Sequence, residues 1–127
     1  MDIRTHKGIN AALCGTPAEV SPGKSVVTMT TSPDMASDHM GLVHGGFVFG
    51  MADYAAMLAV NDPYVVLGAS ETKFLKPVAV GETVTATAVV KEKSGKKRLV
   101  AVSVCRGEAA VLTGTFVCFV LEKHVLG

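Results

Sequence analysis

The chain has 127 residues, of which 49% are hydrophobic and 18% are charged, and its formal net charge is +1. A chain of this length is expected to form one domain, residues 1–127, whose core needs no disulfide or metal. The near-neutral charge speaks against a nucleic-acid-binding surface. The N-terminus has no apolar signal region, and no apolar run reaches the ~20 residues of a membrane-spanning helix. We therefore expect a cytoplasmic protein that binds neither nucleic acid nor membrane.

The first third of the chain has only weak periodic signals. Residues Ile3–Leu13 are expected to form a short helix, because Gly15-Thr16-Pro17 follows them as a helix-breaking sequence. Valine and threonine favour a strand over Ser25–Thr31. The next segment, Ser32–Asp38, is rich in turn-forming and capping residues and is expected to be a loop.

A long helix and a set of strands follow. The helix is expected over Gly45–Asn61, and because it is apolar on nearly every side, other elements should enclose it. Tight connections at Ser94-Gly95 and Gly107 indicate antiparallel strands after it. The expected strands are Val65–Leu75, Thr83–Lys93, Lys97–Arg106 and Glu108–Leu121. The fold class is therefore α+β, with one long buried helix wrapped by a curved antiparallel sheet of about five strands.

The three cysteines, Cys14, Cys105 and Cys118, are odd in number and widely spaced. They lack the close CxxC pairs of structural zinc sites and redox motifs, so we interpret them as reduced thiols and expect no metal site.

His44-Gly45-Gly46 is the most informative motif, because Asp53 follows nine residues after the histidine within an apolar stretch. A lone carboxylate in such a stretch must be neutral, partnered or used, since an unpaired buried charge is strongly unfavourable. Two glycines allow close approach of another molecule where a helix presents unpaired N–H groups. This combination is suited to polarising a carbonyl and delivering a base to it. A structural role for Asp53, capping a backbone group or pairing with a lysine, is the alternative.

The order of elements matches the hotdog fold, and the resemblance extends over about Ser21–Val120. It becomes specific at His44-Gly45-Gly46 with Asp53, and it continues through Lys73–Glu82, which resembles the F-x-x-P-x-x-x-G-D/E segment of acyl-CoA thioesterases of the phenylacetate-pathway (PaaI-like) type. The resemblance implies hydrolysis of an acyl-CoA or related acyl thioester to the free acid and thiol. It implies no cofactor, coenzyme A being part of the substrate, and it does not identify the acyl group.

The resemblance also implies roles for single residues. The Gly45 N–H would bind the thioester carbonyl oxygen, and Asp53 would act as nucleophile or as base towards water. A helix rises ~1.5 Å per residue, so these two residues of one chain are roughly 12 Å apart. The site would therefore be shared between subunits of a homodimer, and the dimers can pair into a tetramer. The residues implied in substrate binding are His44, Gly46, Asp38, Phe47, Met57 and Ser70.

Two positions depart from the family pattern. Many relatives have asparagine where this chain has Asp38, whose ionised carboxylate would repel an oxyanion. Some relatives place a hydroxyl near the attacking water, whereas this chain has Met57 one helical turn after Asp53, with Ser70 and Thr72 as nearby candidates.

Two other functions stay open. Residues 78–90 and 111–121 resemble the malonyl-CoA-binding hotdog domain of a fatty-acid-synthesis repressor, which implies a non-catalytic acyl-CoA- or malonyl-CoA-binding domain. Asp34 and His39 have the spacing of hotdog enoyl-CoA hydratases, which implies a hydratase. A basic cluster around Ser94-Gly95 is interpreted as a solvated hairpin tip, with the phosphates of coenzyme A as its alternative partner. Its members are Lys91, Lys93, Lys96, Lys97 and Arg98.

Overall fold

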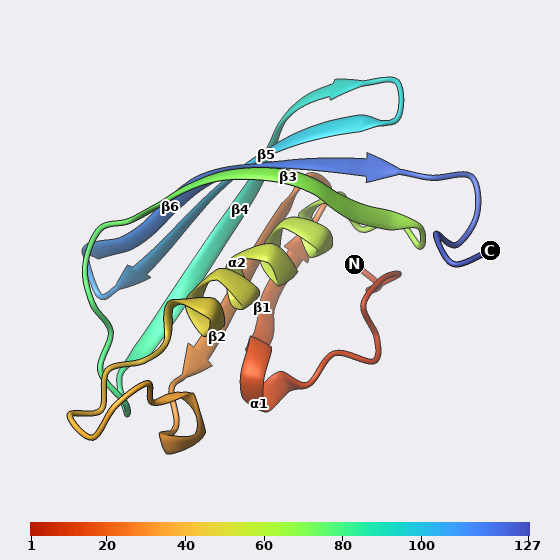
Figure 1. Cartoon of the computed structure of the whole chain (residues 1–127). Helices are drawn as coiled ribbons and strands as arrows, with labels where there is room; N and C mark the ends of the chain where they lie inside the picture. The colour runs from red at the N-terminus through yellow and green to blue at the C-terminus, as the bar shows by residue number, and fades with distance from the viewer.

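One long helix lies against the concave face of an antiparallel sheet in the computed structural model, which describes residues 1–127 (Figure 1). The sheet has six strands in the order β1-β2-β4-β5-β6-β3, so that β1 and β3 form its two edges. The elements are α1 (Ala11–Cys14), β1 (Thr16–Ser21), β2 (Lys24–Thr30), the 3-10 turn η1 (Pro33–Met35), α2 (Gly45–Val60), β3 (Val65–Phe74), β4 (Thr83–Ser94), β5 (Lys97–Arg106) and β6 (Ala109–Val120). This architecture confirms the expected α+β hotdog fold.

The enclosure expected for α2 is confirmed. Nine of its sixteen residues are buried, and they contact strands on both sides of the helix axis. On the facing sheet, β4 shows the predicted alternation, because Val84, Ala86 and Ala88 are buried while the threonines between them are not. The alanines leave room for the helix to pack closely against the sheet. Asn61 ends α2 in the left-handed conformation, with φ of 52°.

The helix expected over Ile3–Leu13 is wrong. Only Ala11–Cys14 is helical, because the Asn10 side chain accepts a hydrogen bond from the Ala12 N–H and caps the helix there. The preceding residues hydrogen-bond to another part of the chain instead. The Asn61 side chain accepts from the Arg4 N–H and donates to the Asp2 carbonyl, each at 2.8 Å. Tertiary contacts thus override a weak local preference.

Two features of the sheet differ from expectation. The sequence pattern did not indicate β1, a sixth strand that is short, carries Pro17 and has a bulge in its pairing with β2. Proline and bulges are typical of edge strands. In addition, β3 pairs with β6 rather than with β4, since the connection between β3 and β4 crosses the sheet. Therefore β3 is a ten-residue edge strand without proline.

Gly15 gives a test of this packing. Its φ is 96°, and a Cβ there would lie 2.8 Å from Val27 Cγ1 and 2.9 Å from the Thr28 carbonyl oxygen. We predict that Gly15→Ala lowers the free energy of unfolding by on the order of 2 kcal/mol or more, because a left-handed backbone and a backbone clash both oppose the methyl group. Gly8→Ala is the matched control, since a Cβ there meets nothing within 4 Å. Urea unfolding of both variants checks the prediction, and equal stability would contradict it.

Candidate active site

The turn before α2 is built around the His44 imidazole. The Gly46 N–H donates to Nδ1 of His44 at 2.9 Å, and the His44 N–H donates to the Met35 carbonyl at 2.9 Å. A Cβ at position 46 would lie 2.8 Å from that Nδ1, so only glycine fits beneath the ring. His44 therefore caps the helix and fixes the orientation of its first turn.

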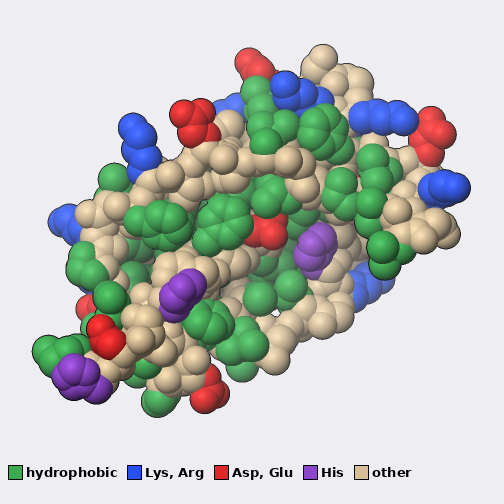
Figure 2. Space-filling model, viewed as in Figure 1, with side chains coloured by type: hydrophobic (Ala, Val, Ile, Leu, Met, Phe, Trp, Pro, Cys, Tyr) green, Lys and Arg blue, Asp and Glu red, His purple; other side chains and the backbone are tan.

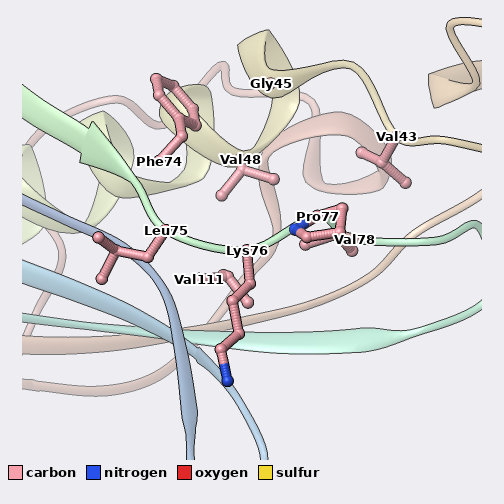
Figure 3. Close-up of a pocket in the computed structure, with 9 residues that line it drawn as sticks. All are labelled: Val43, Gly45, Val48, Phe74, Leu75, Lys76, Pro77, Val78 and Val111. Carbon is pink, nitrogen blue, oxygen red and sulfur yellow. The ribbon is translucent and has the colours of Figure 1, made fainter.

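The Gly45 N–H makes no hydrogen bond within the chain. It is a free donor at the positive end of the α2 dipole, where a carbonyl oxygen or an oxyanion is favoured. A cavity of about 350 Å³ lies beside it (Figure 3). Its lining residues are Val43, Gly45, Val48, Phe74, Leu75, Lys76, Pro77, Val78 and Val111. Figure 3 shows the Lys76 side chain extending away from these mostly apolar residues. The cavity therefore offers the Gly45 N–H as a hydrogen-bond donor among apolar side chains.

Asp53 lies in the middle of α2 and lines a second cavity of about 370 Å³. Its Oδ1 is the single buried side-chain nitrogen or oxygen atom in the chain that has no hydrogen-bond partner. Burial raises the pKa of Asp53 to about 6. The carboxylate is therefore neither capped nor paired within the chain, and it titrates close to the range in which a base operates.

Apolar and polar side chains both surround Asp53. The cavity is lined by Thr5, His6, Asp53, Met57, Pro63, Tyr64, Val65, Val66, Leu67, His124 and Val125. Burial, and secondarily the nearby Asp53 charge, raise the pKa of the thiols of Cys14 and Cys118, the latter to about 12. Both thiols therefore stay protonated and uncharged beside the carboxylate.

Gly45 and Asp53 line two different cavities of the chain. Hydrophobic side chains gather over the face that carries α2, with acidic and histidine side chains set among them (Figure 2). Eight residues of helix at ~1.5 Å each separate the two groups by roughly 12 Å, so one chain alone does not bring them to the same ligand atom.

The other residues implied by the resemblance are spread over both regions. Met57 is buried and lines the Asp53 cavity. Phe47 is half-buried, with its ring edge-on to His44 at 6.4 Å between centroids. Ser70 is exposed on β3, where its hydroxyl bonds with that of Thr72, and neither residue lines either cavity.

Asp38 holds the loop that leads to α2. Its Oδ1 accepts the N–H groups of Met40 at 2.9 Å and of Leu42 at 3.2 Å. The side chain is exposed and lines neither cavity. A carboxylate that accepts backbone N–H groups in this way stabilises the turn.

Residues at both chain ends line the Asp53 cavity without having been expected there. Thr5, His6, His124 and Val125 come from segments without periodic pattern, so no local signal marks them. On the Gly45 side, Phe74 and Leu75 stand within the quoted F-x-x-P segment, but their contact with the helix start depends on the path of the chain. No group of three or more histidine, cysteine or acidic side chains is placed to hold a metal ion.

Two further sequence features lie away from both cavities. The basic cluster at the β4–β5 turn is exposed except for Arg98, which is half-buried. Asp34 in η1 and His39 in the turn after it, the pair with hydratase spacing, are both exposed. No helix is long and apolar enough to cross a membrane.

A family model described as the thioesterase superfamily matches residues 40–113, which include both Gly45 and Asp53. The chain is also similar to a solved structure, the uncharacterized protein PH1136 from Pyrococcus horikoshii. That similarity has a TM-score of 0.99 at 52% identity, and it covers 100% of this chain and 98% of the other.

Three curated relatives carry different names. Methylthioribose-1-phosphate isomerase of Aquifex aeolicus is 52% identical over 91% of this chain and 25% of that protein. Transcription factor FapR of Oceanobacillus iheyensis is 31% identical over 76% of this chain and 51% of that protein. Acyl-coenzyme A thioesterase PaaI of Escherichia coli is 40% identical over 56% of this chain and 51% of that protein. The chain thus spans between a quarter and about half of these relatives.

The hydrogen bonds of Asp38 predict how substitutions there behave. Asp38→Asn keeps an oxygen at the accepting position, so we predict a free energy of unfolding within about 0.5 kcal/mol of the parent. Asp38→Ala removes the oxygen that accepts both hydrogen bonds and should lower the free energy of unfolding by about 1 kcal/mol or more. Thermal unfolding of the two variants measures this. If Asp38→Asn were as unstable as Asp38→Ala, the charge itself, and not the acceptor, would hold the loop.

Proposed function

The chain belongs to the thioesterase superfamily, and from this premise we propose that it hydrolyses an acyl-CoA or related acyl thioester to the free acid and the thiol. The observation that carries the proposal is the buried, unpartnered Oδ1 of Asp53 on an apolar helix. A carboxylate held there at the expense of stability is explained by use in chemistry. The free Gly45 N–H at the start of the same helix supplies the complementary group, a donor for the carbonyl oxygen.

A homodimer would join the two half-sites. The free edge strand β3 contributes Val65, Val66 and Leu67 to the Asp53 cavity at its start, and Phe74 to the Gly45 cavity at its end. Two copies of an edge strand that pair antiparallel about a twofold axis place the start of one beside the end of the other. The Asp53 cavity of one subunit would then adjoin the Gly45 cavity of its partner. Such pairing also satisfies the open backbone groups of the edge.

The reaction follows from these groups. The thioester carbonyl oxygen accepts a hydrogen bond from the Gly45 N–H, and the dipole of α2 stabilises the negative charge that develops on that oxygen. Asp53 of the other subunit either removes a proton from the attacking water or attacks the carbonyl carbon itself. In the water route the C–S bond then breaks, and the thiolate takes the proton that Asp53 received from water. In the nucleophilic route the C–S bond breaks to leave an anhydride of the acyl group with Asp53, and the thiolate takes a proton from solvent. Water then hydrolyses that anhydride, which releases the free acid, returns a proton to solvent and restores the Asp53 carboxylate. Neither route needs a metal or a redox cofactor.

The other residues implied by the resemblance have supporting roles in this proposal. His44 and Gly46 fix the turn that exposes the Gly45 N–H, while Phe47 and Met57 supply apolar surface for the acyl group. Asp38 accepts hydrogen bonds from backbone N–H groups, so in this proposal it stabilises the loop. Its negative charge then has little effect on the thioester. Ser70 lies on β3 at the edge where the second subunit would pair.

A non-catalytic acyl-CoA- or malonyl-CoA-binding domain is the second candidate. The similarity to FapR, named a transcription factor, covers more of this chain than the similarity to PaaI does, 76% against 56%. A binding domain has no need of an unpartnered carboxylate in its cavity, and this favours the enzyme. Asp53 therefore discriminates the two functions.

We predict that Asp53→Asn lowers kcat at least about 100-fold, because the amide keeps the shape but loses the base or nucleophile. Release of free thiol from acetyl, medium-chain, long-chain and aromatic acyl-CoA measures it. The parent kcat/KM should rise as pH increases through the Asp53 pKa of about 6 and then level off, since the ionised form is the active one. Asp34→Asn is the matched control and should keep parental activity. A parent that binds acyl-CoA without releasing thiol would favour the binding domain.

Shared sites predict that two inactive variants restore activity when mixed. Gly45→Pro removes the N–H while proline is well tolerated at the first helical position, and the extended His44 backbone suits a following proline. Refolding it together with Asp53→Asn should give heterodimers with one intact site, and roughly a quarter of parental activity at equal mixing.

Gly45→Ala is the control for this experiment, because alanine keeps the N–H and its Cβ would lie 3.2 Å from the Phe74 ring. It should retain most of the activity that Gly45→Pro loses. Absence of complementation, or a monomer by light scattering at micromolar concentration, would exclude a shared site.

A further inference from the structure

Two residues other than glycine have positive φ, His6 at 54° and Asn61 at 52°. Asparagine and histidine adopt this conformation more often than most residues, but it is uncommon for any residue other than glycine. A residue keeps it where the surrounding structure holds it in place, and such residues are frequent at functional sites. His6 also lines the Asp53 cavity, so its uncommon backbone conformation lies at the candidate active site.

The end of α2 holds the segment that carries His6. The Asn61 side chain accepts from the Arg4 N–H and donates to the Asp2 carbonyl, both at 2.8 Å, and it is buried. Figure 1 shows the N-terminus lying beside the end of α2. The His6 ring packs against Tyr54, the neighbour of Asp53 in the helix, with 6.4 Å between ring centroids. Asn61 at the end of α2 and Tyr54 within it thus hold the His6 segment in two places.

Hydrogen bonding defines which nitrogen of His6 is available. Nδ1 lies 2.8 Å from Oγ1 of Thr5, a buried residue whose hydroxyl has no other partner in the chain. A buried hydroxyl donates where an acceptor is present, so it donates to Nδ1 and the ring carries its proton on Nε2. Burial lowers the pKa of His6, which keeps the ring neutral at pH 7. Nε2–H is left as a donor without a partner.

Besides Asp53 and His6, the polar side chains of the cavity are Thr5, Tyr64 and His124. The Thr5 hydroxyl is bonded to His6, and Tyr64 is exposed. One turn after Asp53 stands Met57, which has no hydroxyl. Ser70 and Thr72 bond to each other outside the cavity. His124 is exposed at the chain end, where its Nδ1 accepts from the Leu126 N–H. His6 is the half-buried, anchored donor in the same cavity as the unpartnered acceptor Oδ1 of Asp53.

We propose that His6 is a second catalytic residue, which holds the hydrolytic water against Asp53 by donating from Nε2 to the water oxygen. The inference rests on the proposed function and concerns its water route. The water gives one proton to Asp53 as its oxygen bonds to the carbonyl carbon. The C–S bond then breaks, the sulfur takes the electron pair, and it receives the proton from Asp53. His6 keeps its proton throughout.

Four variants test this, with kcat and KM measured on the acyl-CoA that the parent hydrolyses fastest. His6→Leu should lower kcat on the order of 10- to 100-fold with KM within about twofold, since water binding and not substrate binding is lost. His6→Gln has an amide N–H near the position of Nε2 and should recover several-fold of that loss. Thr5→Val frees Nδ1, allows the other tautomer, and should lower kcat several-fold. His39→Leu, at an exposed histidine that lines neither cavity, is the matched control and should stay within about twofold of the parent.

The outcomes separate this inference from the proposed function. A parent that hydrolyses no thioester overturns both. An active parent with His6→Leu unchanged, or with His6→Gln no better than His6→Leu, overturns the role of His6 alone. An equal loss in His39→Leu also overturns it, because removal of a histidine outside the cavity would then have the same effect. If His6→Leu does not fold, the other two variants decide. Parental kcat in both His6→Gln and Thr5→Val would then overturn the role of His6.

Discussion

Asp53 is the single charged residue among the sixteen of α2, and the sheet buries nine of those residues. The carboxylate sits on this helix without a hydrogen-bond partner for Oδ1, and burial raises its pKa to about 6. Packing of the apolar helix against the concave sheet is thus the constraint on which the site depends. It sets the depth of the carboxylate and, through that burial, its protonation.

The same helix supplies both ends of the proposed chemistry. In its first turn the Gly46 N–H donates to His44, which fixes the turn, while the Gly45 N–H stays free. Its middle presents the carboxylate two turns later. A rigid helix cannot bend these groups towards one ligand, so their separation is fixed by its rise. The free edge of β3 resolves this separation in the proposed dimer, because it contributes residues to both cavities.

The chain ends contribute to the site through packing, without belonging to any regular element of the sheet. Asn61, which ends α2, binds two backbone groups of the N-terminal segment, and that segment brings Thr5 and His6 to the Asp53 cavity. The residues after β6 close the same cavity from the other side through His124 and Val125. Length and conformation of these two segments therefore affect which acyl groups fit, while the sheet and helix keep the reacting groups in place.

The sequence by itself determined the central helix, five of the six strands and the motif on which the resemblance to the family depends. These features are local: periodicity, caps and glycines act within a few residues of their own position. Residues Gly45 and Asp53 were found this way because a charge in an apolar helix and a double glycine are conspicuous in any context. The tertiary structure decided the rest. The N-terminal segment forms hydrogen bonds with Asn61 instead of a helix, and β3 pairs with β6 across the sheet. His6 reaches Asp53 through contacts between residues 57 positions apart, and no local pattern encodes such a contact.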